Sequence, residues 1–180
     1  MTKSILLITA FSLLIISALM QPCLAKSNLH NASGNPRSLL QKDTVPPGDV
    51  MDIISKVIYA TNSFNIDAVA NLYTPNAVIS DDEPPYSWNG PTAGIQWVNT
   101  IEKVCRDFKL TKFKSAIQRI NVYQQTNDNV FIIVPVNYTG LLPGKVKFST
   151  KGAFTFVLRL VNDKWMIKSQ AWMPEKGLKD

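Results

Sequence analysis

Histidine and cysteine are the residues in shortest supply in this sequence. The 180-residue chain contains one histidine, His30, and two cysteines, Cys23 and Cys105. His30 lies in a polar leader ahead of the predicted domain, which excludes Ser-His and Cys-His nucleophilic catalysis and histidine-rich metal sites from that domain. Cys23 lies in a segment expected to be removed, so Cys105 has no intrachain disulfide partner. The domain must therefore be held together by its core alone.

A hydrophobic run long enough to span a membrane is also missing. The apolar stretch from Ile5 to Met20 follows Lys3 and is about 16 residues long, against the roughly 20 that a spanning helix needs. Cys23-Leu24-Ala25 follows it with small residues, as before a signal-peptidase site. We expect residues 1–25 to be a signal peptide cleaved after Ala25, and the protein to be secreted or periplasmic, without stable membrane insertion after cleavage.

Negative charge is scarce. The chain has 13 acidic and 19 basic residues, a net charge of +6, which becomes +5 when residues 1–25, with Lys3 and no acid, are removed. The densest basic groups lie at 109–114 and 145–151, but along the sequence the lysines are scattered and not interleaved with stacking aromatics. We expect a solvated basic face that attracts anionic surfaces without specificity, and no nucleic-acid partner.

Residues 26–47 are rich in Ser, Asn, Gly and Pro and predict a flexible leader. Apolar residues at helical spacing then predict a helix from Asp49 to about Thr61, a short helix from Ile66 to Tyr73, and a third helix from Ile95 to Phe108. Ala77 to Ile79 predicts a short strand. One domain is expected over residues 48–175, followed by a C-terminal tail at 176–180.

The second half of the domain has the alternation of strands. Four long strands are expected at Phe113–Thr126, Val130–Thr139, Val146–Val161 and Trp165–Met173, separated by short turns that permit only antiparallel hairpins. The fold class is therefore α+β, with a curved antiparallel sheet of about four long strands wrapped around three N-terminal helices in a cone.

The order of these elements resembles the NTF2-like superfamily, in particular its SnoaL-like and ketosteroid-isomerase-like branch. The resemblance rests on the run D-A-x-x-x-L-Y-x-x-N-A from Asp67 to Ala77 and on the closing hairpin KGAFTFVLRLVNDKWMIKSQAW at 151–172. It covers roughly residues 49–174. Folds of this kind host isomerases, cyclases, dehydratases, binding modules and assembly domains, so the fold alone does not assign an activity.

The resemblance places a general base at Asp81, and an enzyme built on it would use Tyr59 or Tyr73 as a proton donor. It also places the two oxyanion donors of a steroid isomerase on Val57 and near Phe156, where neither side chain can donate. One lost donor costs about two to three orders of magnitude in rate, so steroid-type isomerisation is disfavoured. The alternative is that Asp81 to Pro85 form a solvated acidic turn.

Consecutive acids such as Asp81, Asp82 and Glu83 do not converge on one ion without further ligands, so we expect no metal, and we expect no cofactor. The apolar residues expected to line a ligand pocket inside the cone are Val57, Trp97, Phe156, Trp165, Ile167 and Ala171. By strict alternation Trp165, Ile167 and Ala171 share one face of the last strand. Gln170 and Trp172 then lie on the outer face, where they would form the interface of a homodimer.

Three functions remain open. The first is an exported domain that binds a small, largely apolar molecule. The second is an isomerase, cyclase or dehydratase with Asp81 as general base. The third is a dimerisation or assembly module that uses the convex face of the sheet.

Overall fold

The structure is a computed structural model that describes residues 46–176. The predicted signal peptide, the leader up to residue 45 and the last four residues of the tail lie outside these residues. No helix within the described part of the chain is long and apolar enough to cross a membrane.

Two α-helices are present in residues 46–176, α1 (Gly48–Ala60) and α2 (Ala93–Asp107). The apolar stripe predicted for α1 is confirmed, because Val50, Ile54 and Val57 are completely buried. The helix predicted from Ile66 to Tyr73 is wrong: this segment forms turns, in which Asn71 has a positive φ of 64°. A residue in this left-handed conformation cannot continue a right-handed helix.

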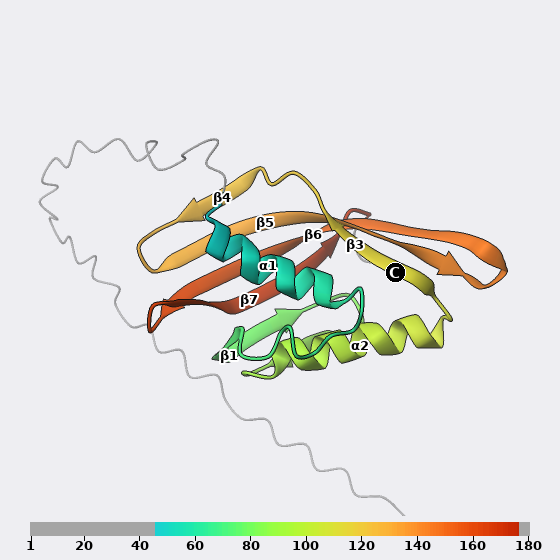
Figure 1. The fold of residues 1–180 in the computed structure, drawn as a ribbon, viewed down its shortest axis with the longest axis horizontal. Helices are drawn as coiled ribbons and strands as arrows, with labels where there is room; N and C mark the ends of the chain where they lie inside the picture. Colours follow the sequence, from blue (N-terminus) through green and yellow to red (C-terminus); the bar gives the residue numbers. More distant parts are fainter. Residues whose placement is uncertain (1–45, 177–180) are drawn as a thin grey trace, which may run out of the picture. The chain divides into compact units, whose positions relative to one another are not determined.

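Seven strands form one sheet (Figure 1). Their order in space is β2-β1-β7-β6-β5-β3, and β4 pairs with β5 beside this path. The strands are β1 (Tyr73–Ser80), β2 (Ser87–Asn89), β3 (Thr111–Ile117), β4 (Val122–Gln125), β5 (Asn129–Leu142), β6 (Val146–Val161) and β7 (Lys164–Pro174). A short 3-10 turn, η2 (Pro143–Lys145), joins β5 to β6.

The prediction of four long antiparallel strands is only partly right. The strand expected from Phe113 to Thr126 is divided into β3 and β4, because residues 118–121 are not in strand conformation. β1 pairs in parallel with β7, from Tyr73 beside Ile167 to Ser80 beside Ala171. The other strand pairs in the described chain are antiparallel, as expected.

An extra residue in β7 changes which side chains face the core. Val157 of β6 pairs with Ser169, whereas the next residue, Leu158, pairs with Ile167. Lys168 is therefore the extra residue of a β-bulge, which reverses the alternation of side chains along the strand. As a result Ile167 and Gln170 are both buried.

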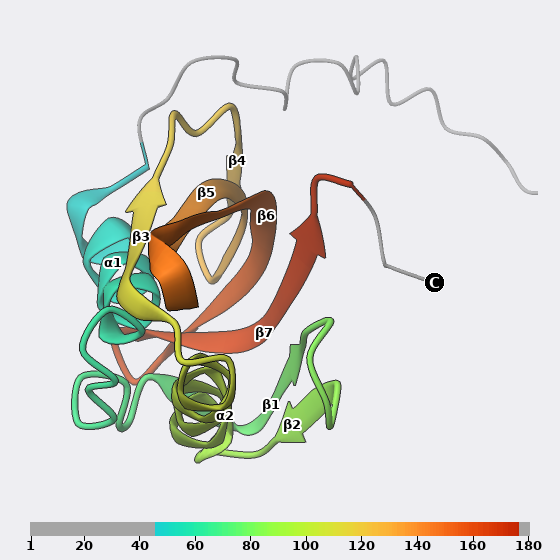
Figure 2. The same cartoon turned by 90° about the vertical axis from the view of Figure 1, so that its right-hand side faces the viewer.

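Both helices lie on the concave side of the curved sheet, α1 against β3 and β7, and α2 against β1 and β2 (Figure 2). Alternate residues of β5 and β6 face these helices and are buried, which is the pattern of a sheet with one covered face. The core is rich in aromatic side chains; Trp97, Phe154 and Phe156 are at most 1% exposed.

Candidate functional site

Asp81 lies directly after β1, on the covered side of the sheet. Ala77 and Ile79 of β1 are buried, and the same alternation turns the Asp81 side chain inward. The indole Nε1–H of Trp97, on α2, donates a hydrogen bond to Asp81 Oδ2 at 2.7 Å. The backbone N–H of Glu83 donates to Oδ1 at 3.3 Å. Asp81 is therefore half-buried and turned toward the core, while Pro84 and Pro85 of the same loop are exposed.

Burial raises the pKa of Asp81 from its ordinary value to about 7. The hydrogen bond from Trp97 lowers this pKa and the neighbouring Asp82 raises it, but burial has the largest effect. A carboxyl with a pKa near 7 is present in both protonation states at neutral pH. It can therefore accept a proton from a bound molecule or donate one to it.

Tyr73 and Gln170 form a buried polar pair between β1 and β7, where Gln170 lies opposite Ile79, two residues before Asp81. The Tyr73 hydroxyl donates a hydrogen bond of 2.7 Å to Gln170 Oε1, and both side chains are at most 1% exposed. Burial raises the pKa of Tyr73, so its hydroxyl stays neutral. The Gln170 Nε2 group has no hydrogen-bond partner within the described residues. Because a buried donor without a partner costs free energy, this amide is a ready contact for a bound acceptor.

Gly94 on α2 makes room for the Tyr73 ring. A Cβ atom at position 94 would lie 2.1 Å from Tyr73 Cε2, far inside van der Waals contact. A glycine is thus required where α2 crosses β1. The close packing of α2 on the Tyr73 ring holds its hydroxyl against Gln170.

Aromatic side chains of β5, β6 and β7 pack together on the covered face of the sheet, beside Trp97. Phe154 packs edge-on against Trp97, with ring centroids 5.6 Å apart, and against Trp172 at 4.7 Å. Tyr138 contacts Trp172 at 5.4 Å. Burial raises the pKa of Tyr138, and the Asp81 carboxylate raises it further. Tyr138 and Asp81 are therefore coupled electrostatically.

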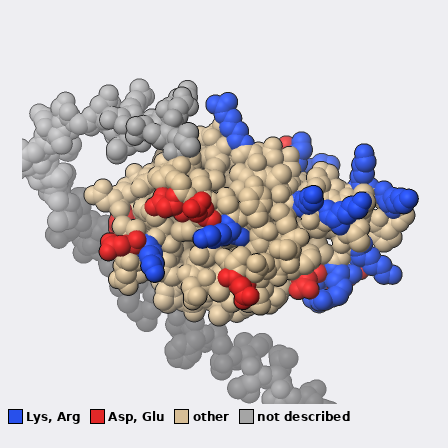
Figure 3. Space-filling model, in the orientation of Figure 1, with Lys and Arg blue, Asp and Glu red and all other residues tan. Residues whose placement is uncertain are grey.

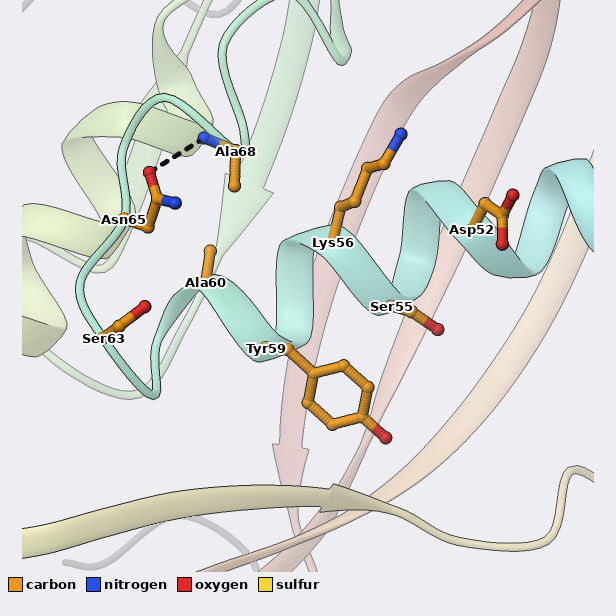
Figure 4. Close-up of a pocket in the computed structure, with 8 residues that line it drawn as sticks. All are labelled: Asp52, Ser55, Lys56, Tyr59, Ala60, Ser63, Asn65 and Ala68. Atoms are coloured by element: carbon orange, nitrogen blue, oxygen red, sulfur yellow. Dashed lines mark hydrogen bonds between the residues drawn. The ribbon is translucent and has the colours of Figure 1, made fainter.

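The structure separates the two predicted proton donors. Tyr73 lies in the core, where its hydroxyl is bonded to Gln170. Tyr59 is 44% exposed on the outer side of α1 and lines a pocket of about 370 Å³ there (Figure 4). In Figure 4 the side chains of Lys56 and Tyr59 point in different directions from α1, so they do not converge on one point. The residues that line this pocket are Asp52, Ser55, Lys56, Tyr59, Ala60, Ser63, Asn65 and Ala68.

The predicted pocket residues divide into three groups. Val57, Trp97, Phe156 and Ile167 are completely buried and form the core, so their role in ligand binding stays a prediction. Trp165 is half-buried at the end of the β6–β7 hairpin. The prediction for Ala171 is wrong, because the bulge at Lys168 turns it to the exposed convex face.

The same bulge corrects the predicted interface. Gln170 is buried and Trp172 packs against Phe154 and Tyr138, so neither residue is on the outer face of the sheet. Tyr138 and the inward position of Gln170 were missed. The alternation of Val130, Ile132, Val134, Val136 and Tyr138 in β5 could have identified Tyr138 as inward-facing. Nothing in the sequence marks the bulge that turns Gln170 inward.

In the part of the chain that the structure describes, carboxylates, cysteines and histidines do not gather into a metal site. No group of three or more such side chains in residues 46–176 is placed to hold a metal ion.

Sequence comparison finds no matching family model and no matching curated protein. Solved structures do match the fold. The hexachlorocyclohexane dehydrochlorinase LinA-type3 from Novosphingobium barchaimii superimposes with a TM-score of 0.60 at 15% identity, covering 71% of this chain and 84% of that one. An NTF2-like superfamily protein from Salmonella enterica has a TM-score of 0.57 at 12% identity, covering 73% and 89%.

A scytalone dehydratase-like protein from Novosphingobium aromaticivorans also has a TM-score of 0.57 at 12% identity, covering 70% of this chain and 81% of that one. The three structures share the same α+β architecture with the present chain. The chain therefore has an NTF2-like, SnoaL-like fold. At these identities the similarity establishes the fold and not the activity.

Proposed function

We propose that this NTF2-like domain is exported and binds a small, largely apolar molecule beside Asp81. The observation that carries the proposal is the carboxyl of Asp81, held by Trp97 at 2.7 Å and raised in pKa to about 7 by burial. A protein interior keeps such a group only at a cost in stability, and costly titratable groups concentrate at functional sites. Ligand sites of this kind combine apolar walls with a few polar groups.

The surroundings of Asp81 define the chemistry of the ligand. Phe154 and Trp172 provide apolar contact area, and Trp172 is only half-buried, so it lies between the core and solvent. The available polar groups are the Asp81 carboxyl and the Gln170 amide. We therefore expect a compact molecule with one or two oxygen atoms and no net charge, such as a sterol, a polyketide-like ring or a short lipid.

A thermal-shift screen of these three compound classes tests the proposal. A ligand at 100 times its dissociation constant stabilises the folded chain by about 2.7 kcal/mol. We expect Asp81→Asn to weaken the shift for every compound that binds at the site. Asp67→Asn, which removes an exposed carboxyl, serves as the matched control. Compounds that shift the wild type and Asp81→Asn equally would place the binding site elsewhere.

An enzyme that uses Asp81 as general base is the second candidate. The pKa of Asp81, about 7, favours this role, because a general base is most effective when its pKa is near the working pH. Val57 and Phe156 occupy the positions of the oxyanion donors that the family resemblance implied, and neither can donate. The Gln170 amide is a remaining donor. For a ligand with a ketone, base catalysis predicts deuterium exchange at the adjacent carbon in D2O, faster above pH 7 and lost in Asp81→Asn.

Self-association through the convex face of the sheet is the third candidate. Small or uncharged side chains cover this face along the middle of β6 and β7, and Met173 is 64% exposed there. Ala171 lies at the centre, between Thr155 of β6 and Ser80 of β1. A homodimer that uses this face should dissociate in the Ala171→Arg variant, as measured by analytical ultracentrifugation. An unchanged sedimentation coefficient would reject this interface.

A further inference from the structure

Two basic groups that are far apart in the sequence meet at one end of the sheet. Residues 109–114 include the first half of β3, and residues 145–151 include the start of β6. β5 lies between them, because Thr111 pairs with Leu141 and Leu141 pairs with Lys147. In Figure 3 the lysine and arginine side chains gather at the right-hand end, where Figure 1 places the β5–β6 hairpin. We call this end the basic tip; its lysines are Lys109, Lys112, Lys114, Lys145, Lys147 and Lys151.

The positive charge of the basic tip is not neutralised by ion pairs. Residues 108–116 and 139–153 contain no aspartate or glutamate. The ion pairs found in the described chain join other residues: Lys103 with Asp107, Arg106 with Glu102, and Arg159 with Asp128. One acid comes close along the strands, Glu175, whose backbone N–H donates to the carbonyl of Lys151. Asp107, two residues before Lys109, is paired with Lys103, so six lysines face the one exposed carboxylate of Glu175 and make a field that attracts anions.

Three of these lysines also adopt a backbone conformation that disfavours a side chain. Lys109, Lys112 and Lys145 have φ angles of 51°, 52° and 62°. Glycine is the residue that adopts this conformation without strain, and Gly144 does so next to Lys145, at φ 75°. The basic tip therefore carries charged side chains where an uncharged glycine would be the less strained choice.

Exposed apolar side chains next to the lysines indicate the kind of anionic partner that the basic tip would bind. Val146 at the apex of the hairpin is 57% exposed, and Phe108 at the end of α2 is 62% exposed. Exposed apolar side chains among lysines suit the boundary between lipid head groups and acyl chains. The six cations are all lysines, whereas arginine is preferred for bidentate contacts to nucleic acid. Within residues 108–114 and 145–151, which the structure describes, Phe108 is the one exposed aromatic ring that could stack on a base.

We propose that the basic tip docks the domain reversibly on an anionic lipid surface. Lys114, Lys147 and Lys151 would face the head groups together, because the pairing of β3, β5 and β6 places them on one face of the sheet. Val146, next to Lys147 in β6, points to the other face of the sheet, so it would reach the interface only if the hairpin enters end-on, with its apex toward the lipid. This docking does not depend on a ligand at Asp81, so each proposal can fail without the other.

Co-sedimentation with vesicles tests the docking. The test uses the chain as recovered from an expression host that exports proteins. The vesicles contain phosphatidylcholine alone or phosphatidylcholine with 30% phosphatidylglycerol. We expect binding to the anionic vesicles in 0.1 M salt and its loss in 0.5 M salt, because added salt screens charge. Each lysine near such a surface contributes about fivefold to binding, so three substitutions should weaken it roughly 100-fold. The tip variant is K114Q/K147Q/K151Q.

A matched variant keeps the change in net charge constant. It replaces three exposed lysines elsewhere in the domain, none of which lies in the basic tip; it is K56Q/K164Q/K168Q. Binding retained in this variant and lost in the tip variant supports the docking, and equal binding by the two overturns it. Failure of the unchanged chain to bind anionic vesicles also overturns it, as does capture by a single-stranded oligonucleotide and not by vesicles. Val146→Ser should weaken vesicle binding several-fold, and unchanged binding would remove the apex from the lipid contact.

Discussion

Replacing Asp81 with asparagine is expected to stabilise the domain at pH 8 and to change its stability little near pH 4. Burial raises the pKa of this carboxyl to about 7 in the folded chain, from an ordinary value of 3.8. Asparagine keeps an oxygen that can accept the 2.7 Å hydrogen bond from Trp97 but carries no charge. It therefore removes the cost of an ionised group in the interior and keeps its main contact.

Proton linkage determines the sign of the effect. Between pH 3.8 and about 7 the folded chain keeps a proton on Asp81 that the unfolded chain has lost. The free energy of unfolding therefore falls as the pH rises through this interval. Each pH unit costs about 1.4 kcal/mol, which sets an upper limit of about 4 kcal/mol for the whole interval. Because Asp81 is partly exposed and solvent screens it, we expect about 2 kcal/mol. Below pH 3.8 the two states bind the proton alike and the difference vanishes.

Urea unfolding at pH 4, 6 and 8, followed by tryptophan fluorescence, measures this difference. The useful quantity is the stability of Asp81→Asn minus that of the wild type, because other titrating groups cancel in it. It should grow by about 2 kcal/mol between pH 4 and pH 8. Asp67→Asn controls for the loss of an exposed carboxyl. A difference that stays flat from pH 4 to pH 8 would show that Asp81 is hydrated, and the ligand site argued from its burial would be refuted with it.

Two further substitutions test the packing that positions the site. Gly94→Ala places a methyl group 2.1 Å from the buried Tyr73 ring and should lower the free energy of unfolding in urea by about 3 kcal/mol or more. Gly48→Ala is the control and should cost little, because a Cβ atom there meets nothing within 4 Å. Equal effects of the two substitutions would contradict the clash. Tyr73→Phe removes the hydrogen bond to the Gln170 amide oxygen and should lower the free energy of unfolding by about 1–3 kcal/mol. Tyr86→Phe is the control, because the Tyr86 side chain is 59% exposed. An unchanged free energy of unfolding in Tyr73→Phe would show that the buried pair adds no stability.

Strand positions were predictable from the sequence where the pattern is long and regular. The bounds of β6 were predicted residue for residue, from Val146 to Val161, because sixteen residues of strand end at clear turn signals on both sides. Side-chain direction in β7 was not predictable past Ile167. One inserted residue, Lys168, reverses the alternation of side chains along the strand. An exposed lysine is compatible with a bulge and with a regular strand, so the sequence does not reveal the insertion.

The position of Asp81 was predictable, but its environment was not. The end of a short strand followed by prolines marked the place, and the resemblance to related folds assigned a base to it. Its contact with Trp97 joins residues 16 apart on different elements, and the paired Tyr73 and Gln170 are 97 residues apart. Neither spacing follows from local periodicity. The parallel pairing of β1 with β7 was missed for the same reason, since no turn connects the two strands.

Because of this parallel pairing, β1 cannot complete its place in the sheet until β7 has been synthesised. Within residues 46–176, β1 pairs with β2 and β7 alone, so during synthesis it leaves the ribosome long before β7 exists. Local hairpins such as β5–β6 can form earlier, because contacts between distant segments are slower to close. The environment of Asp81 is consequently assembled last. A chain that ends or is cut within residues 164–174 would keep most of its hairpins, yet it would lose the support that holds this carboxyl in the interior.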